Sequence, residues 1–247
     1  MSDIAELLGS HIQTLFLTVV RLFCFFWCIP GMGDFVVPRR IRLVVALAVS
    51  FPVAQVLQAE ASVSLSTILG EAMVGFFLGT LVRIFFDSFV FLGALLGHQT
   101  NFGNAVRSDL GRQTRDLFSV FFNLFFVAIF FTTDLYLLLL QGICATYKTI
   151  PVGLTLRDAG FLESGLLSLE SGLTSAFSLV VPFWVMGILY YMILGFLNRV
   201  IPMLPVFFVG QPLMIVCVFL MLTVCLSRFA SGFFKVWIDF VYKIFVI

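Results

Sequence analysis

Long apolar segments separated by short charged loops constrain this chain more than any other feature of its sequence. They cover about residues 12–33, 43–58, 68–102, 116–147, 165–197, 206–227 and 233–247. A membrane-spanning helix needs about 20 mostly apolar residues. The first, fifth and sixth segments are long enough for one span each. The third and fourth are too long for one straight span, so they predict tilted helices or hairpins of two shorter helices.

The scarcity of charge supports a membrane setting. Charged residues make up 11% of the 247-residue chain and hydrophobic residues 61%, whereas soluble globular domains are roughly 25% charged. The polar residues are too few to cover a water-facing surface, which excludes an ordinary soluble enzyme, a disordered chain and a secreted disulfide scaffold. The outside must therefore face lipid, other subunits or both. The net charge of +1 gives no indication of a nucleic-acid partner.

Helices are favoured over strands by segment length and by the leucine, alanine, methionine and phenylalanine content. Alternation with period two, which a transmembrane barrel requires, is not seen. Pro52, Pro182 and Pro212 lie inside apolar segments, where each promotes a kink. We therefore predict an all-α integral membrane-type protein with about six long apolar helical segments, several as kinked helices or helical hairpins. We expect residues 1–247 to form a single domain.

One helical row in the third segment combines charge with glycine. Its members are spaced four apart and lie one above the other on a helix, namely Glu71, Gly75, Gly79, Arg83 and Asp87. Arg83 and Asp87 have the spacing of an ion pair along one helix. Charge at membrane depth is costly and needs a partner. The row could be a structural ion pair that locks two helices together, a subunit interface, or an ion or proton path.

Glycine pairs in the same segment predict close helix packing. Gly75 and Gly79 form a GxxxG groove that another helix can approach closely, and Gly93 and Gly97 form a second one. Because 18 residues make five helical turns, the two grooves fall on one face if the helix is continuous.

The loop at residues 101–116 is unusually polar for this chain. It holds two glycines and five charged residues between apolar tracts. It could be a solvent-exposed connection, but longer loops more often carry function. A polar loop bounded by glycines could also lie across a pore.

A basic stretch follows the first apolar segment. Pro38 stands where a new helix can begin, and Arg39, Arg40 and Arg42 flank that start on its polar side. A lipid-headgroup anchor is one interpretation of this stretch.

Catalytic patterns are missing from the sequence. The two histidines, His11 and His98, are not part of an HExxH motif or a ligand pair, and neither a Walker nor a GxGxxG pattern occurs. We therefore expect no enzymatic activity, no cofactor and no metal.

Taken in order, several stretches resemble the FliR/SctT family of type III export apparatus proteins. They are VPRRIR at 37–42, LGEAMVGFFLGTLVR at 69–83, the Gly93, Gly97, Gln99 and Gly103 run, IPVG at 150–153 and NRVIPMLPVFFVGQPL at 198–213. Two places depart from the family pattern, with Ser108-Asp109-Leu110 in place of Asp-Pro and Pro202-Met203-Leu204-Pro205 in place of Pro-Gln-Leu-Asn. The Val-Gly-x-Pro-Leu and Ile-Pro-x-Gly forms look more like the flagellar branch than the virulence branch.

The resemblance implies a non-enzymatic core subunit of an export gate in the bacterial inner (cytoplasmic) membrane, within a helical pore complex. Implied partners are FliP-like and FliQ-like gate subunits, a FlhB-like switch protein, the ring of the secretion basal body, membrane lipid and unfolded export substrates. The alternatives are an SctT-type subunit of a virulence system or a small secondary transporter. A transporter would need internal repeats and a polar midplane site, and the two halves show no convincing repeat.

The resemblance also implies that the polar loop is the plug that closes the pore. The implied gate residues are Gly103, Asn104, Arg107, Asp109, Arg112 and Arg115. Pro38, Arg40 and Arg42 would belong to a loop between helices.

Overall fold

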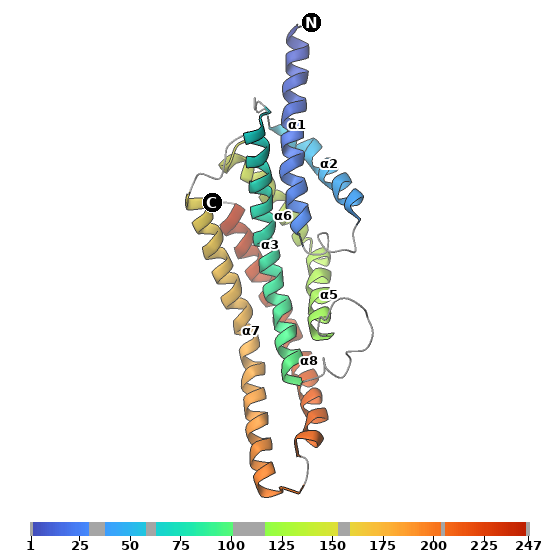
Figure 1. The fold of residues 1–247 in the computed structure, drawn as a ribbon, viewed down its shortest axis with the longest axis vertical. Coiled ribbons are helices and arrows are strands. Elements are labelled where there is room, and N and C mark those ends of the chain that lie inside the picture. The colour runs from blue at the N-terminus through green and yellow to red at the C-terminus, as the bar shows by residue number, and fades with distance from the viewer. Residues whose placement is uncertain are drawn as a thin grey trace. The chain divides into compact units, whose positions relative to one another are not determined.

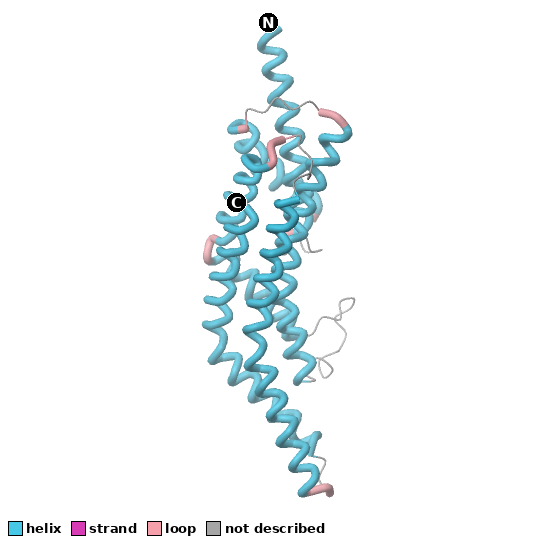
Figure 2. The backbone as a smooth tube through the Cα atoms, turned by 90° about the vertical axis from the view of Figure 1, so that its left-hand side faces the viewer, coloured by secondary structure: helices cyan, strands magenta, loops and turns pink. Residues whose placement is uncertain are grey.

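The computed structural model describes residues 2–29, 38–57, 63–100, 117–152, 159–203 and 206–245, and these ranges hold helices and no strand (Figures 1 and 2). The helices are α1 (Ser2–Cys28), α2 (Arg39–Val56), α3 (Leu65–Thr100), α5 (Leu117–Thr132), α6 (Leu135–Thr149), α7 (Ala159–Val200) and α8 (Val206–Phe245). The prediction of an all-α chain is confirmed.

Four of these helices are long and apolar enough to cross a membrane. The candidate spans are His11–Cys28 in α1, Leu65–Thr100 in α3, Gly165–Val200 in α7 and Gly210–Phe245 in α8. Taken together, α5 and α6 could form one more. Pro52, Pro182 and Pro212 lie inside α2, α7 and α8, as the sequence predicts.

The two overlong segments have different structures. The third is one continuous helix of 36 residues, α3, and not a hairpin. The fourth is broken at Thr133 and Asp134, as expected of two shorter helices. Asp134 has φ 54°, in the left-handed region that a short polar side chain tolerates but that an α-helix cannot continue through.

The last two apolar segments form a single helix, which the sequence did not predict. Helix α8 has 40 residues and runs through Arg228 and Ser231 without interruption. Both side chains are exposed. A charged residue interrupts an apolar segment in the sequence, but on an exposed helix face it does not interrupt the helix itself.

The chain divides into two compact units. The first comprises residues 1–86, 133–170 and 238–247, and the second comprises residues 87–132 and 171–237. In the first unit α1 packs on α2 and α3, and Figure 1 shows α2 lying beside α1. Each unit has its own buried side chains, including Val74, Leu78 and Val82 of α3 in the first.

Phenylalanine, which occurs 32 times, builds the core of the second unit. Four phenylalanines spaced four apart form one buried row along α5, at positions 118, 122, 126 and 130. Phe126 contacts Phe89 of α3 at 5.2 Å and Phe233 of α8 at 4.8 Å between ring centroids. Phe130 contacts Trp237 at 5.4 Å. Edge-to-face and tilted ring pairs of this kind contribute beyond the area they bury.

Candidate functional site

A buried ion pair joins α1 to α3 in the first unit. The side chains of Arg21 and Glu71 are both 0% exposed. The Nε atom of Arg21 donates to Oε2 of Glu71 at 2.5 Å, and Nη2 donates to Oε1 at 3.1 Å. This geometry is bidentate: two donors of the planar guanidinium face the two oxygens of the carboxylate. Such pairs are strong and directional.

The remaining donors of Arg21 reach the end of α6. Its Nη1 and Nη2 atoms each donate to the carbonyl oxygen of Ile150 at 3.2 Å. The guanidinium carbon lies 4.1 Å from the centre of the Tyr147 ring. A cation is favourable near the carbonyl end of a helix and over an aromatic face. Arg21 therefore ties three helices together at one buried point.

Glycines on α3 make this approach possible. A Cβ atom at Gly75 would collide with the carbonyl oxygen of Arg21 and lie 3.0 Å from its carbonyl carbon. At Gly79 it would lie 2.7 Å from the carbonyl oxygen of Phe25 and 2.8 Å from Cβ of Cys28. The backbone of α1 thus rests directly on α3, which brings Arg21 to Glu71.

The second glycine pair lies in the second unit. A Cβ atom at Gly93 would lie 2.7 Å from both the carbonyl carbon of Phe118 and the Cα atom of Ser119. Gly93 therefore packs against the first turn of α5. Gly97 is also buried, and its carbonyl accepts a hydrogen bond from Oγ1 of Thr100 at 3.2 Å.

Arg83 and Asp87 differ from the expected row of buried charge, since both side chains are exposed in the chain. Residues four apart on a helix wind about 40° per step, so a row drifts around the helix. Residues 83 and 87 are three and four steps from Glu71, so they point in other directions around α3 than Glu71 does. The partner of Glu71 is instead Arg21, which lies 50 residues earlier in the chain, in α1.

The expected gate residues Gly103, Asn104, Arg107, Asp109, Arg112 and Arg115 lie outside the described residues. The end of α3, immediately before them, is held by α7 within the second unit. The hydroxyl of Tyr191 donates to the carbonyl oxygen of Gln99 at 2.7 Å. The neighbouring Tyr190 donates to the carbonyl oxygen of Gly210 in the first turns of α8.

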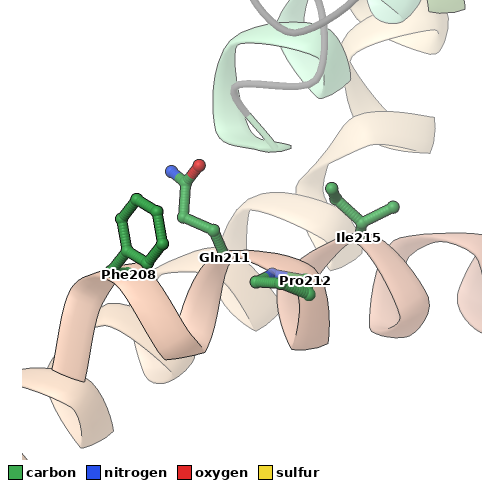
Figure 3. Close-up of a pocket in the computed structure, with 4 residues that line it drawn as sticks. All are labelled: Phe208, Gln211, Pro212 and Ile215. Carbon is green, nitrogen blue, oxygen red and sulfur yellow. The ribbon is translucent and has the colours of Figure 1, made fainter. Parts of the chain in front are cut away.

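These two tyrosines border a cavity of about 30 Å³, large enough for one water molecule. It is lined by Gln99, Thr100, Tyr190, Tyr191, Leu194, Gln211 and Met214. The buried Oε1 atom of Gln99 has no hydrogen-bond partner among the described residues. A larger open pocket of about 480 Å³ lies on α8, where Figure 3 shows Gln211 extending from the helix between Phe208 and Ile215.

The basic stretch is placed at the start of α2, so Arg40 and Arg42 belong to this helix and not to a loop between helices. Pro38 is the residue before the first helical turn and is exposed, as is Arg40. Arg42 is buried, with 5% of its surface exposed. The guanidinium groups of Arg39 and Arg42 lie 5.7 and 5.3 Å from the centre of the Trp27 ring. The sequence did not indicate that Trp27 takes part.

Comparison with known proteins identifies the family. Residues 12–239 match the bacterial export proteins, family 1. The flagellar biosynthetic protein FliR of Aquifex aeolicus is 29% identical, covering 92% of this chain and 93% of that protein. FliR of Bacillus subtilis is 26% identical over 92% of this chain and 90% of its own length, and FliR of Caulobacter vibrioides is 25% identical over 85% of each. Because the match extends from α1 to the last turns of α8, this chain belongs to the bacterial export proteins, family 1.

Proposed function

We propose that this chain is a non-enzymatic core subunit of the flagellar type III protein export gate in the bacterial inner membrane. The observation that carries the proposal is the family match over residues 12–239. The flagellar names of the relatives from Aquifex, Bacillus and Caulobacter support the flagellar branch over an SctT-type virulence subunit. The driving energy for export would come from elsewhere, because the sequence has no nucleotide-binding motif.

The partners in this proposal are FliP-like and FliQ-like subunits, with a FlhB-like switch protein and the basal-body ring around them. The apolar surface of α7 supports a covered setting. Ile188, Met192, Ile193 and Phe196 are each more than half exposed in the isolated chain. An apolar surface of this extent on a helix must be covered by lipid or protein. The helices of the complex would together line a pore for unfolded substrates.

The polar loop at residues 101–116 would close that pore and would be displaced by an arriving substrate. Its position supports this role, because it directly follows a helix end that Tyr191 fastens to α7. A loop with one fixed base can move without disturbing the helices that carry it.

Native mass spectrometry of the tagged chain, extracted from its own host in mild detergent, tests the assembly. We expect one copy of this chain bound to several copies of two other small membrane proteins. An isolated monomer or homodimer would contradict the proposal and favour a small secondary transporter.

Deletion of residues 104–114 tests the plug. We expect the deletion complex to assemble normally and to conduct ions in planar bilayers without substrate, because the pore has lost its closing segment. A control complex in which these residues are replaced by an equally long scrambled sequence separates the loop's specific contacts from its bulk. Closed channels after the deletion would refute the plug.

A further inference from the structure

We propose that the basic cluster formed by Trp27, Arg39, Arg40 and Arg42 binds the phosphate of an anionic phospholipid headgroup. This binding site does not depend on the export function. The cluster belongs entirely to the first unit, where the end of α1 meets the start of α2.

Two arginines of the cluster lie near the same aromatic ring. The guanidinium carbons of Arg39 and Arg42 lie 5.7 and 5.3 Å from the centre of the Trp27 ring. Arg42 is buried there, whereas Arg39 and Arg40 are exposed and can reach a ligand. Contact with an aromatic face offsets part of the repulsion between the cations. Arginine presents a planar set of donors that matches the oxygens of a phosphate.

Basic residues outnumber acidic ones in the sequence around α2. Helix α2 has no acidic residue in its first turn or elsewhere along its length. Between Cys28 and Val56 the sequence has three arginines and one acid, Asp34. Positive charge is also unfavourable near the N-terminus of a helix. An anion from outside α2 would relieve both effects.

The position of the cluster favours lipid as the source of that anion. Trp27 lies in the last turn of the candidate span His11–Cys28, where tryptophan is typical of the headgroup level of a membrane. Basic residues directly beside a span attract anionic lipids. Helix α2 is not one of the candidate spans, yet it exposes Ile41, Val44 and Phe51 by more than half. A helix with a basic start and an exposed apolar face suits a membrane interface better than an acidic protein surface.

Lipid titration of the purified full-length chain tests the site. The chain in neutral detergent is titrated with phosphatidylglycerol or phosphatidylcholine, and bound lipid is counted by native mass spectrometry. We expect phosphatidylglycerol to bind more tightly. We expect Arg39→Gln/Arg40→Gln to weaken its binding by about 30-fold, since each arginine near a lipid surface contributes about fivefold. Phosphatidylcholine binding should not change.

A matched variant separates this site from general charge. Arg228→Gln/Lys235→Gln removes two exposed positive charges from α8 and should leave phosphatidylglycerol binding intact. Thermal unfolding of all variants checks that the exposed substitutions leave the fold unchanged. Equal phosphatidylglycerol affinity in the parent and the Arg39/Arg40 variant would overturn the proposal, as would an equal loss in the α8 variant. The proposal would also be overturned if the Arg39/Arg40 variant bound phosphatidylglycerol like the parent but lost its partner subunits in cells. An acidic protein surface would then be the ligand.

Discussion

Substitution of Glu71 by glutamine gives the most direct test of how the first unit is held together. In the parent chain Arg21 donates to both carboxylate oxygens of Glu71 and twice to the carbonyl oxygen of Ile150. The Glu71→Gln variant keeps the carbonyl and the Tyr147 ring but removes the carboxylate that pairs with the fully buried Arg21 guanidinium. Breaking one side of a buried ion pair costs about 3–5 kcal/mol. That is a large part of the total stability of a typical domain, about 5–15 kcal/mol.

The free energy of unfolding can be measured on the full chain in mixed micelles by titration with sodium dodecyl sulfate, followed by circular dichroism. Glu163→Gln is the matched control, because Glu163 is exposed. We expect that control to change stability by less than about 0.5 kcal/mol. A Glu71→Gln variant within about 1 kcal/mol of the parent would refute the reasoning.

The double variant Arg21→Met/Glu71→Leu makes the test sharper. Replacing a whole buried ion pair by apolar residues of similar size is often neutral or stabilising. We therefore expect the double variant to be more stable than Glu71→Gln alone by at least about 3 kcal/mol. If the double variant were as unstable as Glu71→Gln, packing and not charge would explain the loss.

Three further substitutions probe the other contacts. Gly79→Leu should abolish the folded, monodisperse chain because even a Cβ atom collides with α1 there. Gly195→Leu should be tolerated, since beyond the helix's own backbone no atom of the described residues lies within 4 Å of an added Cβ; size-exclusion chromatography distinguishes the two variants. Phe126→Ala should lower the free energy of unfolding by about 3–5 kcal/mol as a buried ring is lost, and Phe121→Ala, at a ring 43% exposed, should cost clearly less. Tyr191→Phe removes the hydrogen bond to the end of α3 and, if the loop is the plug, should raise the leak conductance of the assembled complex by about 2- to 10-fold; an unchanged leak would argue against that fastening.

The helices could be predicted from the sequence because apolar length is a local property. Excess length predicted tilted helices or hairpins for the third and fourth segments alike, but only the fourth is broken, at Thr133 and Asp134. The continuity of α8 through Arg228 could not be predicted. The sequence alone does not tell whether a charged residue ends a helix or lies on its exposed face. That distinction depends on which neighbours surround the helix.

The buried ion pair was only half predictable. The four-residue spacing identified Glu71 as a charge on a glycine-lined face, but spacing relates residues of the same helix only. Its partner Arg21 is 50 residues away, and their contact depends on α1 resting on Gly75. The available signal was that Arg21 is the one charged residue of its apolar segment and that Glu71, an acid in another apolar segment, has the opposite charge. The gate residues of the 101–116 loop stay a prediction.

The left-handed residue between α5 and α6 restricts where that part of the chain can reside. Two helix ends meet there, and backbone groups at helix ends lack helical hydrogen-bond partners. The hydrocarbon interior of a bilayer offers no substitute, so irregular backbone at that depth occurs only beside water or inside protein. Thr133 and Asp134 are exposed in the isolated chain. This corner must therefore lie in water or against another subunit, and the apolar residues on either side of it do not amount to a simple lipid-facing crossing.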